Sequence, residues 1–136
     1  MDERELQQSL KNLELYKAQM ESLDQQYEFM AHTIQEITKA KDTMMAYRDV
    51  EEGSEMLTPV GGSSYLFTKA SSTDKAIVGI GAEIAVETKI DDAITKLEER
   101  IKEVDEAMKS LNKRYSEVAN IASELATKIQ SAYGTM

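Results

Sequence analysis

The sequence predicts a mainly α protein with a small β region: a long antiparallel two-helix coiled coil whose helices are joined by two tandem β-hairpins. Two observations support this fold class. Apolar residues recur at alternating spacings of three and four over about six heptads in each half of the chain, which is typical of a coiled coil. The stretch between the halves instead contains short runs of alternating polarity and turn residues. We expect the 136 residues to form a single domain.

The composition argues against several classes of function. The formal net charge is -9, whereas nucleic acids and anionic membranes attract Lys- and Arg-rich surfaces. The chain has no Cys, which excludes disulfides and thiolate metal sites. No apolar run approaches the roughly 18 residues of a membrane span. The N-terminus lacks a basic start followed by an apolar core, so we expect a cytoplasmic protein.

The first predicted helix covers residues 2–52. Asp2 followed by Glu5 resembles a capping box, and Gly53 follows the last turn. With Leu6 at heptad position a, the a and d positions are mostly apolar. They hold Leu6, Leu13, Met20, Tyr27, Ile34 and Lys41 at a, and Ser9, Tyr16, Leu23, Met30, Ile37 and Met44 at d. A long helix with so narrow an apolar stripe needs a partner to cover it.

The middle segment, residues 55–88, predicts strands at 55–60, 64–70, 76–80 and 83–87. Turns are expected at Gly61-Gly62 and Gly81-Ala82. Two short hairpins have open edges and little cover, so we expect them to close into a β-barrel with hairpins of other subunits. The residues expected to drive this assembly are Leu57, Val60, Leu66, Phe67, Ile77, Val78, Ile80, Ile84 and Val86.

The second predicted helix covers residues 89–133, and Thr88 with Asp91 resembles a second capping box. Its seam is apolar at every position. The d positions are Ile90, Leu97, Val104, Leu111, Val118, Leu125 and Ala132, and the a positions are Ile94, Ile101, Met108, Tyr115, Ala122 and Ile129. Because the two helices have similar lengths and leave the same middle segment, they most simply pair antiparallel.

The apolar surface widens toward the free ends of both helices, where Leu10, Ala119, Ile121, Ala126 and Tyr133 lie beside the seam and Leu15 lies at position c. A two-stranded coil cannot bury all of these side chains. We therefore expect an exposed apolar patch at this tip, far from the hairpins. Contact with apolar segments of other proteins is expected from Leu6, Leu10, Leu13, Ile121, Leu125, Ile129 and Tyr133.

The sequence contains no pattern that supports catalysis. The only His, His32, falls at heptad position f on the solvent side. Gly79-Ile80-Gly81 begins like a dinucleotide-binding fingerprint but lacks the third Gly and the following helix. No His, Asp and Glu residues are spaced as metal ligands. We expect no enzyme activity, no cofactor and no metal.

One segment makes the resemblance to a known family specific. Leu57-Thr58-Pro59-Val60-Gly61-Gly62 matches an L-x-P-[VL]-G-G element, and Val78-Gly79-Ile80-Gly81-Ala82 matches a V-G-[IV]-G-A element that precedes a helix. With two flanking coiled-coil arms, the chain resembles the alpha subunit of prefoldin (GimC) of archaeal type. Two tandem hairpins, rather than one, are similar to the alpha class and not to the beta class.

The resemblance implies a heterohexamer of two alpha and four prefoldin beta subunits, with a double β-barrel body and six arms. It also implies ATP-independent capture of non-native client proteins at the arm tips, prevention of their aggregation, and transfer to a group II chaperonin. The competing interpretation is a structural scaffold or adaptor whose coiled coil binds one folded partner.

Overall fold

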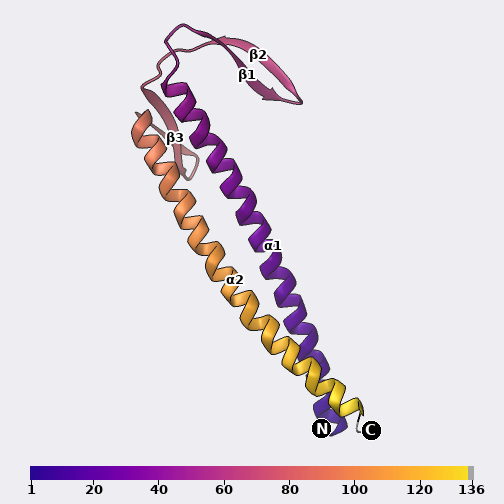
Figure 1. Ribbon diagram of the computed structural model, residues 1–136. Coiled ribbons are helices and arrows are strands. Elements are labelled where there is room, and N and C mark those ends of the chain that lie inside the picture. The colour runs from indigo at the N-terminus through magenta and orange to yellow at the C-terminus, as the bar shows by residue number, and fades with distance from the viewer. Residues whose placement is uncertain (135–136) are drawn as a thin grey trace. The chain divides into compact units, whose positions relative to one another are not determined.

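The computed structural model describes residues 1–134 of the chain. Helix α1 (Glu3–Arg48) is followed by strands β1 (Glu55–Gly61), β2 (Ser64–Lys69), β3 (Lys75–Gly81) and β4 (Ile84–Lys89), and then by helix α2 (Ile90–Gly134). The two helices run in opposite directions (Figure 1). This order confirms the predicted fold class of two long helices joined by two hairpins.

Helix α1 begins as the sequence predicts. The Asp2 carboxylate accepts a hydrogen bond from the backbone N–H of Glu5 at 2.8 Å, which satisfies one of the free donors of the first turn. The helix ends at Arg48, earlier than the predicted residue 52. The chain must turn here, because the N–H of Gly53 donates to the carbonyl of Ala70 at 2.7 Å. Gly53 has φ +87°, a conformation that Gly adopts without strain.

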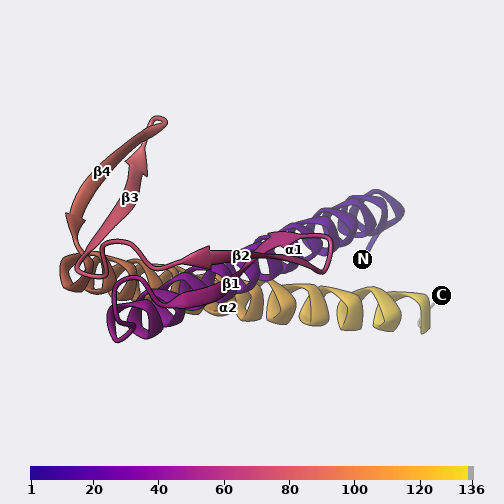
Figure 2. The ribbon, with the colours of Figure 1, turned by 90° about the horizontal axis from the view of Figure 1, so that it is seen from above.

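Both hairpins are antiparallel two-stranded ribbons (Figure 2) with the same internal register. β1 pairs with β2 from Glu55↔Lys69 to Gly61↔Ser64, and β3 pairs with β4 from Lys75↔Lys89 to Gly81↔Ile84. Each has a register shift just before its turn. The second hairpin therefore repeats the first one 20 residues later, bulge included.

The turns lie one residue later than predicted. Gly62-Ser63 and Ala82-Glu83 form them, all with φ between 51° and 60°, which fits the type I′ turn of a two-residue hairpin loop. Gly61 and Gly81 instead occupy the shifted register position at φ 96° and 103°. The glycines thus predicted the approximate place of both turns. The positive φ of Ala82 and Glu83 was not predicted, because neither residue is a glycine.

The predicted cap of α2 is wrong. Thr88 lies within β4, where it pairs with Ala76, and the strand continues through Lys89 directly into the helix. Because α2 begins at Ile90, the residue that flanks its first turn is Lys89 and not Thr88. The N–H of Ile90 donates instead to the carbonyl of Asp74 at 2.9 Å.

The chain forms two compact units. One combines residues 1–33 with residues 104–134, so the first part of α1 lies with the last part of α2, as an antiparallel pairing requires. The other contains residues 34–103. Every predicted a and d residue of α1 is buried or half-buried, and so is every one of α2 except Tyr115, which is 37% exposed. The predicted coiled-coil seam is thus confirmed.

Candidate functional site

The apolar side chains of the hairpins are mostly open to solvent in the single chain. Phe67 is 88% exposed, Ile77 is 70% exposed, and Leu57, Val60, Leu66, Ile80, Ile84 and Val86 are between 36% and 56% exposed. Val78 differs, because it is only 4% exposed within its own chain. Tyr65, at 61%, belongs with the exposed set although the sequence reading left it out.

Cross-strand pairing places these residues on definite faces of each ribbon. Leu57 pairs with Phe67 and Pro59 with Tyr65, so all four lie on one face of the first hairpin. In the second hairpin, Val78 pairs with Val86. This pair lies on the face opposite to the one that corresponds to Leu57 and Phe67 of the first hairpin. Alternation along β2 from Tyr65 to Phe67 is the signal that could have identified Tyr65. The first hairpin therefore presents an aromatic and aliphatic face with no cover.

The second hairpin is anchored to helix residues of the same unit. Arg100 donates from Nη2 to the carbonyl of Gly79. Val78 is buried in the unit that also buries Ala93 and Leu97 of α2. In the connection before β3, the Ser72 hydroxyl donates to the Asp74 carboxylate at 2.5 Å and holds the pKa of that carboxyl below its usual value.

Two further contacts tie the end of α1 to this unit. Arg48 Nη1 donates to Asp91 Oδ1 at 2.7 Å, and this hydrogen bond raises the pKa of Arg48. The phenol oxygen of Tyr47 accepts a hydrogen bond from the N–H of Ser71 at 3.0 Å. These contacts join the end of α1 to the start of α2 and to the connection between the hairpins, and neither covers the exposed apolar face of the first hairpin.

The residues expected to bind clients all lie in the unit of residues 1–33 and 104–134, and the structure separates them by exposure. Leu6 and Ile129 are each 6% exposed, and Leu13 and Leu125 are half-buried. Leu10, Ile121 and Tyr133 are 36%, 44% and 56% exposed. Leu6, Leu10 and Tyr133 line one open hollow of about 530 Å³ together with Glu3 and Gln7. An apolar floor is therefore present there, with a carboxylate beside it.

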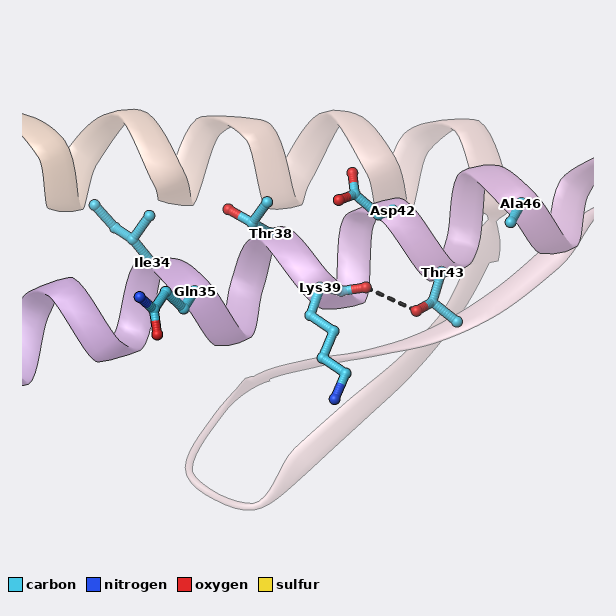
Figure 3. A pocket seen from close by; sticks show the side chains of 7 residues that line it. All are labelled: Ile34, Gln35, Thr38, Lys39, Asp42, Thr43 and Ala46. Atoms are coloured by element: carbon cyan, nitrogen blue, oxygen red, sulfur yellow. Dashed lines mark hydrogen bonds between the residues drawn. The ribbon is translucent and has the colours of Figure 1, made fainter. Parts of the chain in front are cut away.

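A second hollow, of about 630 Å³, lies along one flank of α1 (Figure 3) and is lined by Ile34, Gln35, Thr38, Lys39, Asp42, Thr43 and Ala46. The Thr43 hydroxyl donates to the Lys39 carbonyl at 2.7 Å, a local helix contact. Ile34, Thr38 and Asp42 extend toward the neighbouring helix ribbon in Figure 3, whereas Lys39 extends away from it. The lining brings no acid–base pair or nucleophile and base together.

No group of three or more His, Cys, Asp or Glu side chains that could hold a metal ion occurs in residues 1–134. Within the same residues, neither helix is long and apolar enough to cross a membrane. What the described residues offer is apolar surface on long helices and on hairpins.

Comparison with known proteins gives consistent results. The family model for a prefoldin subunit matches residues 16–135. The prefoldin subunit alpha of Methanococcus aeolicus is 31% identical over 136 residues, covering 97% of this chain and 92% of the relative. That of Pyrococcus horikoshii is 34% identical over 128 residues, covering 93% of this chain and 86% of the relative.

Two solved structures share the fold. A filamentous prefoldin from Methanocaldococcus jannaschii matches with a TM-score of 0.74 and 24% identity, covering 86% of this chain and 97% of that one. The prefoldin beta subunit from Thermococcus strain KS-1 matches with a TM-score of 0.63 and 22% identity, covering 94% of this chain and 91% of that one.

Proposed function

Because the chain belongs to the prefoldin family, we propose that it is the alpha subunit of a cytoplasmic co-chaperone that binds non-native proteins without ATP. In this proposal the chain prevents client aggregation and passes clients to a group II chaperonin. The observation that carries the proposal is the apolar hollow of Leu6, Leu10 and Tyr133, with Ile121 exposed in the same unit. We refer to Leu10, Ile121 and Tyr133 as the tip surface.

The tip surface suits clients that have no fixed shape. Burial of apolar area is non-directional, so leucine, isoleucine and tyrosine side chains accept many apolar segments. Leu6 and Ile129 are buried in the seam, and their role is to position the exposed residues. A single surface of this size binds weakly, but several arms acting on one unfolded chain gain affinity through effective concentration.

Several arms require an assembly, and the hairpins supply its contacts. We propose that the exposed face of Leu57, Tyr65 and Phe67 is covered by hairpins of prefoldin beta subunits, in a hexamer of two alpha and four beta chains. Two-stranded ribbons with open edges are marginal in water, and closure into a barrel removes those edges. The sequence relationship to curated prefoldin alpha subunits supports this arrangement.

The test uses the assembled complex and an aggregation assay. Leu10→Ser together with Tyr133→Ser removes apolar surface from the tip without touching the buried seam. We expect the complex to suppress the aggregation of citrate synthase diluted from denaturant several-fold less well. Met45→Ser is the matched control, because Met45 is a 39% exposed apolar residue in the other unit.

Equal protection by the tip variant and by the unmodified complex would refute the assignment of the tip surface. A scaffold that binds one folded partner would instead give saturable binding to that partner and no general protection against aggregation.

A further inference from the structure

Between residues 15 and 33 of α1, heptad positions c, f and g hold no Asp, Glu, Lys or Arg. Heptad positions c, f and g lie together on the side of the helix away from the a and e positions. Over this length they hold Leu15, Ala18, Gln19, Ser22, Gln25, Gln26, Phe29, His32 and Thr33. We refer to these nine residues as the outer stripe. Because 30% of the chain is Asp, Glu, Lys or Arg, and an outer coiled-coil face normally collects them, this gap is unusual. In α2 the f positions begin with Asp92, Glu99 and Glu106.

Two large apolar side chains stand out from the outer stripe. Leu15 is 67% exposed and Phe29 is 73% exposed, although both belong to a unit that has a seam in which to bury them. They are 14 residues apart, which is two heptads or about 21 Å along the helix. The residues between them include Ala18 and Ser22, whose short side chains leave room for larger side chains of a partner. A row with this spacing matches the apolar stripe of another α-helix.

A line of carboxylates runs beside the outer stripe. Glu14, Glu21 and Glu28 occupy three successive b positions, directly beside the f positions of the stripe, and all three are exposed. No ion pair among residues 1–134 includes any of them. Their regular spacing places a negative charge along one flank only, since the other flank leads to the d positions of the seam. A partner helix would complement this flank with Lys or Arg at heptad spacing.

We propose that the outer stripe docks an amphipathic α-helix of a folded partner protein, which carries an apolar stripe and a row of Lys or Arg along one flank. The partner's apolar stripe covers Leu15 and Phe29, and its basic flank pairs with Glu14, Glu21 and Glu28. This mode is helix against helix, with a fixed register. It differs from client capture, because it needs a folded helix and a defined charge pattern rather than any apolar segment.

The experiment measures binding of a designed probe to the complex assembled from the full chain. The probe is a fluorescein-labelled, helix-stabilised peptide of three heptads with Leu at a and d and Lys at each g position. A second peptide has Glu in place of each Lys. Fluorescence anisotropy should show the Lys peptide binding at least tenfold more tightly than the Glu peptide. Phe29→Asp should weaken the Lys peptide at least tenfold, and its solvent exposure leaves the helix content by circular dichroism unchanged.

Charge reversal tests the register independently of folding. Replacing Glu14, Glu21 and Glu28 by Lys should invert the preference, so that the Glu peptide binds more tightly. The matched control replaces Glu103, Glu106 and Glu124 by Lys, which adds the same charge at exposed positions of α2 and should leave the preference for the Lys peptide in place. Equal binding of the two peptides, or the same inversion in the control, would overturn the proposal.

The tip surface provides the last discrimination. Leu10→Ser with Tyr133→Ser should reduce client protection and leave binding of the Lys peptide within twofold. If that double variant abolishes peptide binding while Phe29→Asp does not, the peptide is held as a client and the docking proposal fails, whereas the proposed chaperone function stands.

Discussion

Replacing Phe67 by Ala should weaken assembly strongly while leaving the isolated chain folded. The ring is 88% exposed in the single chain, so its removal costs the chain itself little. If assembly covers it, the buried area is about 150–200 Å², which at about 25 cal/mol per Å² corresponds to roughly 4 kcal/mol. Loss of the packing around a buried Phe is of the same order. Since about 1.4 kcal/mol is tenfold, the assembly constant should fall by a factor of about 10²–10³.

Native mass spectrometry of the co-expressed complex over a dilution series measures this shift directly. Phe29→Ala is the matched control, because Phe29 is the only other phenylalanine in the chain and is 73% exposed on a helix. The complex with Phe29→Ala should dissociate at the same concentration as the unmodified one. If Phe67→Ala also leaves the midpoint of dissociation unchanged, Phe67 is not covered on assembly and the barrel interpretation of the first hairpin is wrong.

Three further predictions concern the fold and its pH dependence. Val118→Ala, at a residue 1% exposed in the seam, should lower the free energy of unfolding by about 1–3 kcal/mol in urea titration, and Ile121→Ala, at 44% exposure, by clearly less. Ala82→Gly relieves the backbone strain of an alanine at φ 51° and should raise the free energy of unfolding, measured by thermal melting, by about 0.5–1 kcal/mol. Ala85→Gly in β4 should lower that free energy. Asp74 has a lowered pKa, so its contribution is present above the usual carboxyl range and is lost as pH falls through the native value. Asp74→Asn should therefore melt earlier than the unmodified chain at pH 7, and the two melting temperatures should converge in strong acid.

The coiled-coil seam was predictable because one physical requirement dominates it. A long polar helix must bury its single apolar stripe, and the heptad spacing of that stripe identifies its members one by one. Even Ser9 and Lys41, which are polar, are half-buried where the pattern places them. Tyr115 departs from the pattern, because a large side chain with a phenol at its end reaches the edge of the seam and stays 37% exposed.

Details of the hairpins were less accessible to sequence reasoning. Glycine indicates that a turn is near but does not identify its two central residues. Here Gly61 and Gly81 lie at the register shift, and the two residues after each of them form the turn. Thr88 has the side chain of a helix cap, yet pairing with Ala76 keeps it in a strand. Local preference therefore loses to ladder hydrogen bonds formed elsewhere in the chain.

The tip residues illustrate a different difficulty. The client-binding prediction included Leu6 and Ile129, which the heptad pattern places in the seam, together with Leu10 and Tyr133, which it places beside the seam. The structure buries the first two and leaves the other two open. The heptad pattern did not single out Phe29, because one aromatic residue outside the a and d positions does not alter that pattern. Its significance appears only with its exposure and its spacing from Leu15.

One hairpin is repeated at a 20-residue interval, and in the assembly proposed above this repetition would set the number of sheets that the subunit can join. Each hairpin is a separate two-stranded ribbon with free edges, so one chain offers two separate modules for pairing with strands of other chains. A subunit with a single ribbon offers one such module. In the assembly proposed above, the duplicated hairpin would make this chain a connector between two sheets, and the number of such chains would limit how many sheets one particle holds together.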